Sequence, residues 1–369
     1  MLKQKCFCTP RLLAVVAVTA ALLSGCQTHT AKTTTVPIVT TATAAKLPSS
    51  VMEKVLGEGL YEMVLFPSIN RLYVASAQSF KQDNGGVLYK VDPETLTVVG
   101  TTHTDLKNFG MVSQPGKDFF YTTNSVDGTV SKIDVTSGKV LQRLTLSKKN
   151  DKGEIDGARE MLWVGNELYI GAVANPGYIS VVDTQSFRLK TRITHAGKWV
   201  TGLLYSPSTQ RIYAGNGSGE IMVINPKTHH IEQRWTSGES KPNLFLNFAE
   251  DPHTHRLFVT DNSEGKATYV FDEQTGKVIK KIPGDSLSIK FNAQRNELYI
   301  SQRESRQVLS LDTTTYAVKQ RWHFAGSPNS LLLTDDGKTL YVTVKQDFNS
   351  DFSSKGPDSL VRIRLETNK

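Results

Sequence analysis

The sequence predicts an all-β fold, a seven-bladed β-propeller of four-stranded antiparallel blades. Three observations support this prediction. A unit of short β-branched or aromatic runs occurs seven times, its aromatic anchors lie 41 to 48 residues apart, and most units close their third run with an apolar residue followed by Asp or Asn. A four-strand unit repeating at roughly 40–45 residues is typical of a propeller blade, and such blades must stack in a ring to bury their faces. The anchors are Tyr73, Tyr121, Tyr169, Tyr213, Phe258, Tyr299 and Tyr341.

The first 25 residues are typical of a bacterial lipoprotein signal. Lys3, Lys5 and Arg11 precede or border an apolar run over residues 12–23, which ends in Leu-Ser-Gly-Cys. That run is too short to span a membrane comfortably. We therefore predict a signal peptide over residues 1–25 and lipidation of Cys26, which anchors the protein in the membrane; an ordinary secretory signal is the alternative. Gln27 stands where Asp would direct inner-membrane retention, so we expect an outer-membrane lipoprotein facing the periplasm.

Residues 26–50 form the next segment and are rich in Thr, Ala and Val, without an aromatic residue. This composition predicts a flexible tether. Cys6 and Cys8 leave with the signal, so the mature chain has no cysteine pair for a disulfide or a metal site. The signal also carries three cations, and its removal lowers the formal net charge from +8 to +5. A mildly basic protein is compatible with an anionic partner but does not require one.

Residues 51–369 are predicted to be the propeller domain, closed by its own first strand. Each unit contains an inner strand a, a strand b with the anchor, a strand c before the Asp, and an outer strand d. The outer strands are expected near residues 96–102, 140–146, 187–193, 231–235, 278–282 and 317–323. The seventh unit stops after strand c. We therefore predict that residues 51–56 supply its outer strand and leave no open edge between the chain ends.

The loop lengths distinguish the two faces of this ring. The a–b and c–d connections are tight and contain Asp, Pro and Gly, which are turn residues. The b–c and d–a loops share the other face, and two of them are extended, over residues 77–86 and 345–358. These insertions belong to the first and seventh blades, so they are expected to meet. Residues 147–157 form another long loop there. Long loops on a rigid scaffold commonly carry function.

Several strings in the domain resemble the YncE proteins, exported seven-bladed propellers of the YVTN-repeat type. They include Gly-Leu-Tyr-Glu-Met at residues 59–63, Asp-Leu-Lys-Asn-Phe-Gly at 105–110, Gly-Lys-Trp-Val-Thr-Gly at 197–202 and Asp-Gly-Lys-Thr-Leu-Tyr-Val at 336–342. The resemblance covers about residues 51–365. It implies a non-catalytic binding protein, with single-stranded DNA as a type of ligand. The lipoprotein-type signal and the tether depart from the soluble periplasmic form that the family implies.

The residues that enter strand a are expected to ring the mouth of the central channel. Each blade presents different chemistry at this place, which indicates either a ligand site or a network that pins the blades together. Two carboxylates near an arginine could bind a cation or a polar ligand, or they could satisfy one another and buried backbone groups. The candidate ligand-binding residues at the mouth are Tyr61, Glu62, Phe109, Arg159, Glu160, Trp199, Thr201 and Asn329.

The loop-bearing face also carries cations interleaved with aromatic residues. Cations that meet phosphates, beside rings on which bases stack, are what a single-strand binder needs. Nearby Asp and Glu residues would oppose a polyanion, so a solvated mixed-charge surface is the alternative. The candidate nucleic-acid-binding residues are Phe80, Lys81, Lys107, Lys148, Lys149, Lys198, Arg303, Arg306 and Lys345.

Three functions remain open from the sequence. The first is a monomeric, non-catalytic binding protein of the cell envelope whose ligand is single-stranded DNA or another anionic polymer. The second is a scaffold for envelope proteins, with the two meeting insertions as its contact surface. The third is a metal-dependent, lactonase-like hydrolase that uses Glu62, Glu160, Asn247 and Asn329. No His-Glu-x-x-His, P-loop or Gly-x-Ser-x-Gly pattern stands in a suitable context, so we expect no catalytic residue, cofactor or metal.

Overall fold

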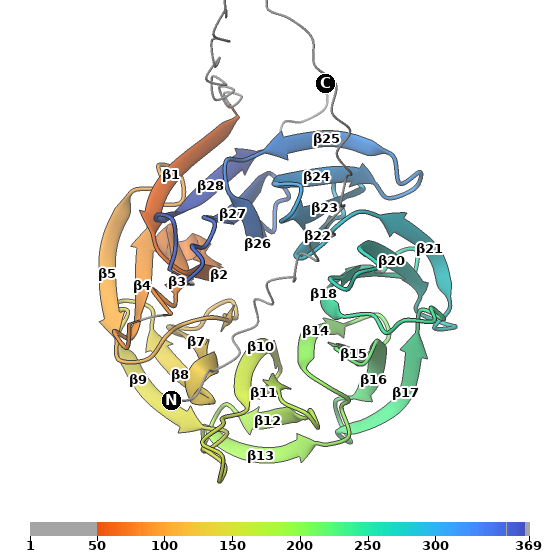
Figure 1. The fold of residues 1–369 in the computed structure, drawn as a ribbon, viewed down its shortest axis with the longest axis horizontal. Coiled ribbons are helices and arrows are strands. Elements are labelled where there is room, and N and C mark those ends of the chain that lie inside the picture. The colour runs from red at the N-terminus through yellow and green to blue at the C-terminus, as the bar shows by residue number, and fades with distance from the viewer. Residues whose placement is uncertain (1–49, 81, 352, 366–369) are drawn as a thin grey trace, which may run out of the picture. The chain divides into compact units, whose positions relative to one another are not determined.

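Seven four-stranded antiparallel sheets form a ring, which confirms the predicted seven-bladed β-propeller (Figure 1). The computed structural model describes residues 50–80, 82–351 and 353–365. Cys26, Lys81 and the predicted signal peptide lie outside these residues. The helices in the described ranges are two 3-10 turns, η1 (Pro67–Ile69) and η2 (Ser125–Asp127), and none is long and apolar enough to cross a membrane.

Each blade contains four strands in up-and-down order, from the centre of the ring to its rim. The innermost strands are β2 (Leu60–Phe66), β6 (Met111–Val112), β10 (Gly157–Val164), β14 (Val200–Ser206), β18 (Phe245–Asp251), β22 (Ile289–Asn292) and β26 (Ser327–Leu333). The second strands are β3 (Arg71–Ser76), β7 (Phe119–Asn124), β11 (Glu167–Val173), β15 (Arg211–Asn216), β19 (Arg256–Asp261), β23 (Glu297–Gln302) and β27 (Thr339–Lys345). The third strands are β4 (Gly86–Val91), β8 (Thr129–Asp134), β12 (Ile179–Asp183), β16 (Glu220–Asn225), β20 (Ala267–Asp272), β24 (Gln307–Asp312) and β28 (Asp358–Arg364). The outer strands are β5 (Val98–Thr104), β9 (Val140–Thr145), β13 (Arg188–Ile193), β17 (His230–Thr236), β21 (Val278–Pro283), β25 (Val318–His323) and β1 (Val51–Gly57).

The N-terminal strand closes the ring, as the sequence predicts. β1 pairs antiparallel with β28, with Val51 opposite Ile363, and the last sheet has the order β1-β28-β27-β26. The backbone N–H of Arg364 donates to the carbonyl of Ser50 at 2.9 Å, which extends the pairing past the strand end. The first and last described segments therefore lie side by side at the edge of the seventh blade (Figure 1).

The apolar core is divided among the seams between blades. The described residues form seven apolar clusters, and each cluster contains side chains from two neighbouring blades. Every aromatic anchor is at most 2% exposed and packs against the following blade; Tyr341, for example, contacts the first blade's Leu60 cluster. The repeated anchor is therefore the residue that joins one sheet to the next, which explains its recurrence in the sequence.

Four blades add a buried hydroxyl to this packing, two residues after the anchor. We call these residues the seam hydroxyls. Each accepts a hydrogen bond from a backbone N–H of its own blade and donates one to a backbone carbonyl at the entrance of the next blade. Their acceptor and donor distances are 2.9 and 2.9 Å for Thr123, 3.0 and 2.7 Å for Thr260, 2.9 and 2.9 Å for Ser301, and 3.1 and 3.2 Å for Thr343.

Candidate functional site

The inner strands begin on the loop-bearing face with an irregularity in their pairing. The register between inner and second strand shifts between Leu60 and Met63 in the first blade, and between Ala158 and Met161 in the third. A bulge of this kind re-aims side chains and ends regular pairing. Tyr61, Glu62, Arg159 and Glu160 lie within these two shifts, so the predicted mouth residues stand where the sheets are irregular.

Five residues from four blades form one cluster at this mouth, which we call the cation–aromatic cluster. It contains Tyr61, Phe80, Phe109, Arg159 and Lys345. The ring centroids of Tyr61 and Phe109 are 4.8 Å apart, and those of Phe80 and Phe109 are 6.0 Å apart. The guanidinium carbon of Arg159 lies 4.6 Å from the Tyr61 centroid and 5.4 Å from that of Phe109. The ammonium of Lys345 lies 3.8 Å from the Tyr61 centroid. The three distances between a cation and a ring are within the range of a cation–π interaction.

Arg159 keeps hydrogen-bonding capacity within this cluster. Its Nη1 is buried and has no acceptor in the described part of the chain. The aromatic faces attract the cation but satisfy none of its N–H groups, and an unpaired buried donor is unfavourable. A carboxylate or phosphate oxygen from a ligand would complete the bonding of this guanidinium.

The two predicted carboxylates beside the arginine differ from each other. Glu62 Oε1 accepts a hydrogen bond of 2.7 Å from Ser330 Oγ, which links the first and seventh blades. Burial, and then the negative charge of Glu62, raise the pKa of Glu160, although the positive charges of Arg159 and Lys290 lower it. The side chain of Glu160 nevertheless keeps partial contact with solvent. The raised pKa favours the protonated form of Glu160, which reduces the negative charge beside Arg159.

The remaining mouth residues serve mainly to join the blades. Thr201 Oγ1 donates to the carbonyl of Phe245 at 2.5 Å, and the carbonyl of Asn329 accepts from Ser301 Oγ at 2.9 Å. The amides of Asn329 and Asn247 donate to Ser330 Oγ and to the carbonyl of Leu287. These contacts fit the alternative interpretation of the mouth, a hydrogen-bond network that holds neighbouring blades together.

Trp199 belongs to a separate pair on the same face. Its backbone φ of 56° lies in the left-handed region, which is strained for a bulky side chain. The ammonium of Lys198 lies 3.6 Å from the centroid of its ring, and the carbonyls of both residues accept from the N–H of Gly217. The indole is only half-buried, so part of its surface faces solvent.

The predicted cations of the loop-bearing face fall into three groups. Lys107 is only 7% exposed, and its ammonium donates to the carbonyls of Ala77, Ser79 and Gln82 at 3.1, 2.7 and 2.9 Å. The sequence places Lys107 on this face, but the structure turns its charge inward, because the 77–85 loop wraps around it with carbonyl oxygens. Lys107 thus fixes the shape of an insertion instead of presenting a free charge on its surface.

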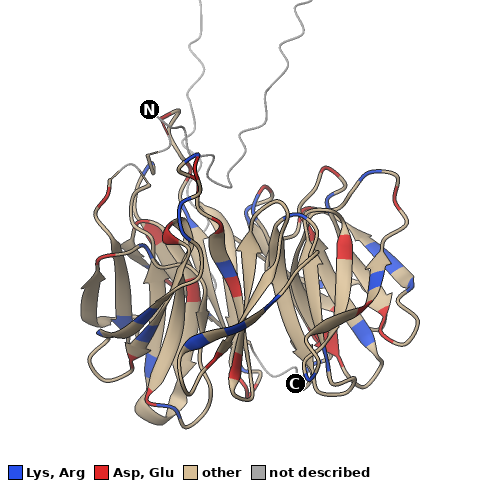
Figure 2. Ribbon diagram, turned by 90° about the horizontal axis from the view of Figure 1, so that it is seen from below, with Lys and Arg blue, Asp and Glu red and all other residues tan. Residues whose placement is uncertain are grey.

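A second group is paired with the acidic residues of the same loops. Lys345 Nζ lies 3.7 Å from Asp358 Oδ2, and Arg306 Nη2 lies 2.8 Å from Asp347 Oδ2. Figure 2 shows basic and acidic residues mingled over the loops instead of separated into one basic face. Lys148 and Lys149 form the third group, since they are exposed and make no ion pair with a described residue. Arg303 is partly exposed and likewise has no described ion pair.

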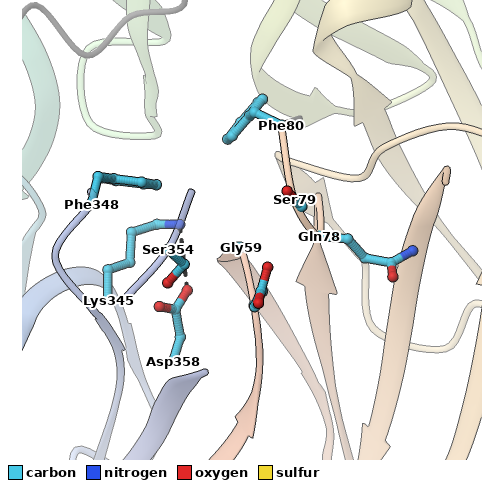
Figure 3. A pocket seen from close by; sticks show the side chains of 9 residues that line it. Gly59, Gln78, Ser79, Phe80, Lys345, Phe348, Ser354 and Asp358 are labelled. Atoms are coloured by element: carbon cyan, nitrogen blue, oxygen red, sulfur yellow. Dashed lines mark ion pairs between the residues drawn. The ribbon is translucent and has the colours of Figure 1, made fainter. Parts of the chain in front are cut away.

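The two extended insertions meet, as their positions in neighbouring blades predict. Gln78, Ser79 and Phe80 from the first blade and Phe348 and Ser354 from the seventh line one hollow (Figure 3). Its volume is about 10 Å³, enough for roughly one water molecule. Figure 3 shows Phe80 and Phe348 approaching from opposite sides above the Lys345–Asp358 ion pair. The insertions therefore form a joint rim beside the cation–aromatic cluster and not a deep pocket.

No group of three or more His, Cys, Asp or Glu side chains is placed to hold a metal ion within residues 50–80, 82–351 and 353–365. Two features of the site were missed by sequence reasoning. The positive charge of Lys290, in the sixth blade, lowers the pKa of Glu160, and no sequence motif includes Lys290. The seam hydroxyls, in contrast, always stand two residues after an anchor, so the alignment of the repeats could have revealed them.

The fold and the site together define a seven-bladed β-propeller with a cation–aromatic cluster at the mouth of its loop-bearing face. No family model matches the chain. Its sequence is 35% identical over 320 residues to Uncharacterized protein YncE of Salmonella typhimurium strain LT2, covering 85% of this chain and 90% of that protein. It is 33% identical over 334 residues to Uncharacterized protein YncE of Escherichia coli strain K12, covering 89% and 94%. The chain belongs to the YncE family.

A more distant similarity is 26% identity over 260 residues to Antigen Lp49 of Leptospira interrogans, covering 67% of this chain and 56% of that protein. The YncE relatives instead cover most of both chains, so the similarity is not confined to the short strings.

Proposed function

We propose that this protein is a non-catalytic binding protein of the cell envelope that holds single-stranded DNA, or a similar anionic polymer, on its loop-bearing face. The observation that carries the proposal is the cation–aromatic cluster with the unpaired Nη1 of Arg159. Stacking rings beside cations allow bases and phosphates to be bound at once, without dependence on sequence. The raised pKa of Glu160 favours its neutral form, which would repel a phosphate less than a carboxylate.

The exposed cations support the same ligand away from the mouth. Lys148 and Lys149 stand on the 147–157 loop without described ion partners, and Lys198 is held against the half-exposed Trp199. A DNA strand that follows this face would contact the positive charges of the 147–157 loop and the indole ring of Trp199. The internal ion pairs of Arg306 and Lys345 limit the net attraction, so we expect moderate affinity.

The test is fluorescence anisotropy with a labelled oligodeoxynucleotide at several salt concentrations. Binding should weaken with salt by about 0.7 logarithmic units per phosphate contacted for each tenfold rise in salt. Arg159→Met should weaken binding about tenfold, on the scale of one stacking or cation–π contact. Lys148→Ala/Lys149→Ala should also reduce the salt slope. Lys117→Ala is the matched control, because this exposed lysine lies in a tight turn on the opposite face. Salt-independent binding, or equal affinities in all variants, would contradict the proposal.

The location of the protein is part of the proposal. Lipidation of Cys26 would hold a monomeric propeller at the outer membrane, facing the periplasm. Labelling with a radioactive fatty acid tests this, since the wild-type chain should incorporate label and enter the outer-membrane fraction, whereas Cys26→Ser should do neither. Label retained by Cys26→Ser would refute lipidation at this residue.

One observation favours a second candidate, a scaffold for envelope proteins. The insertions of the first and seventh blades converge into a single rim that carries Phe80 and Phe348. Replacing residues 347–355 with a Gly-Ser loop of equal length should then abolish cross-linking to a partner in intact cells without lowering the melting temperature. Unchanged cross-linking would exclude this rim as the contact surface.

A further inference from the structure

A pair of carboxyl groups lies at the seam between the fourth and fifth blades, on the face of tight turns. Glu250 is the penultimate residue of β18, and Glu273 follows the end of β20. Glu273 is 5% exposed, and both of its carboxylate oxygens are buried without a hydrogen-bond donor among the described residues. Glu250 Oε1 accepts hydrogen bonds from Ser206 Oγ at 2.7 Å and Ser208 Oγ at 2.9 Å. Both serines belong to the fourth blade, so Glu250 crosses the seam.

The strongest charges that act on Glu273 are acidic. After burial, the largest effects on its pKa come from Glu250, Asp251 and Asp272, and all of them raise it. On the fourth blade the facing titratable group is the buried Tyr213, whose hydroxyl donates to Thr209. On the fifth blade, the backbone carbonyl of His255 accepts a hydrogen bond from the N–H of Glu273. The imidazole of His255 lowers the pKa of Asp272.

The neighbouring aspartates differ from Glu273 because their own turns satisfy them. Asp251 accepts from the N–H of His253 and from Thr254 Oγ1, and Asp272 accepts from the N–H of Thr275 at 2.7 Å. The hydrogen bonds to Asp272 lower its pKa and favour its ionised form. Glu273 has no such donor, so a negative charge there would be both buried and unpaired, which is strongly unfavourable.

We propose that Glu273 and Glu250 share one proton at neutral pH, and that this proton holds the seam between the fourth and fifth blades together. The protonated carboxyl of Glu273 donates to Glu250, and Glu250 in turn accepts from the two serines of the fourth blade. Loss of the proton leaves two adjacent carboxylates that repel one another, so Glu250 is pushed away from Ser206 and Ser208. The seam is then a pH-sensitive point of the ring.

The direction of the pH effect follows from burial and charge. Burial, and then repulsion by Glu250, raise the pKa of Glu273 from its ordinary 4.5 to about 8. A carboxyl whose pKa is higher in the folded than in the unfolded chain stabilises the fold fully below the unfolded value. That contribution is lost as the pH rises through about 8. Alkaline pH is therefore the condition that loosens this seam.

The primary test is a titration of the wild-type protein with glutamate labelled at its side-chain carboxyl carbon, followed by NMR in the presence of a chelator. The resonance of Glu273, identified by its absence from Glu273→Gln, should titrate near pH 8. If all glutamates assigned to the pair titrate below pH 6, the carboxyls are both ionised and the proposal is overturned. If Glu273→Gln fails to fold, Glu160→Gln removes the other glutamate with a strongly raised pKa, and the resonance that still titrates near pH 8 is that of Glu273.

The second test compares melting temperatures across pH. The wild-type melting temperature should fall by about 5 °C between pH 6 and pH 9 as the proton is lost, whereas Glu273→Gln should show a smaller fall. Glu250→Gln should likewise flatten the profile, and Glu94→Gln is the control, because Glu94 is paired with Arg362 and Arg364 elsewhere. Parallel profiles for wild type and Glu273→Gln would overturn the proposal. Recovery of the pH 9 melting temperature on addition of calcium or magnesium would also overturn the proposal. The two carboxylates would then be a cation site and not a pair that shares a proton.

Discussion

Replacing Thr343 by valine removes one seam hydroxyl while nearly preserving the shape of the side chain. Thr343 is fully buried in β27 of the seventh blade. Its Oγ1 accepts from the N–H of Ser330 at 3.1 Å and donates to the carbonyl of Tyr61 at 3.2 Å. Because Tyr61 belongs to the first blade, the hydroxyl lies at the seam that completes the ring.

The expected loss of stability follows from these two contacts. Valine leaves the Ser330 N–H without an acceptor and the Tyr61 carbonyl without this donor. An unsatisfied buried donor costs about 1–3 kcal/mol, and with the second lost bond we expect a destabilisation of about 2–4 kcal/mol. Thr343→Ser keeps the hydroxyl and loses one methyl group, which should cost about 1 kcal/mol.

Equilibrium unfolding in urea, followed by tryptophan fluorescence, measures both changes. Thr101→Val is the matched control, because this exposed threonine on β5 makes no described side-chain hydrogen bond and should change stability by less than about 0.5 kcal/mol. Thr260→Val should resemble Thr343→Val, and the double variant should be additive because the two hydroxyls share no hydrogen-bond partner. A Thr343→Val protein as stable as Thr343→Ser would refute the role assigned to the hydroxyl.

Three further outcomes are expected. Lys107→Met should expose the 77–85 loop to proteolysis, since its carbonyls lose the ammonium that gathers them, while cleavage elsewhere stays unchanged; equal loop cleavage in both proteins would contradict this. Hydrogen bonds from Arg364 and Arg362 lower the pKa of Glu94, so its contribution to stability is present above the ordinary glutamate pKa and is lost as the pH falls through the lowered value. Glu94→Gln should therefore lose less stability on acidification than wild type. Identical curves of stability against pH for the two proteins would contradict the stabilising role of the pairing of Glu94 with Arg362 and Arg364. Deleting residues 1–57 should expose the edge of β28 and produce dimers or aggregates in size-exclusion chromatography, whereas a monomeric product would show that the edge is harmless.

The repeat made the architecture predictable from sequence, because each blade must bury the same seam with the same kind of residue. The anchor at Tyr299 and the Asp312 turn recur through the chain at nearly constant spacing, and the unpaired seventh unit implied that β1 completes it. The outer strands begin and end within about two residues of their expected positions. Periodic packing therefore leaves a strong record in a single sequence.

The site was less predictable, because side-chain direction depends on irregular backbone. The sequence shows that Arg159 and Glu160 enter the ring, but the bulge between Ala158 and Met161 decides what they face. Lys107 is a further example. The sequence predicts that it binds nucleic acid, yet the carbonyls of Ser79 and Gln82 accept hydrogen bonds from its ammonium. Loop conformation and the pairing of opposite charges are properties of three-dimensional contact, which composition does not reveal.

The pairing of β1 with β28 also makes the order of the blades along the chain arbitrary. Arg364 and Ser50 are joined by a backbone hydrogen bond, so the two ends of the propeller lie within reach of a short hairpin. A connection of a few residues there, with new ends cut into any tight turn, would give a circular permutant with the same neighbours around the ring. Every blade packs between two neighbours, so the packing of the sheets does not depend on which blade comes first in the chain.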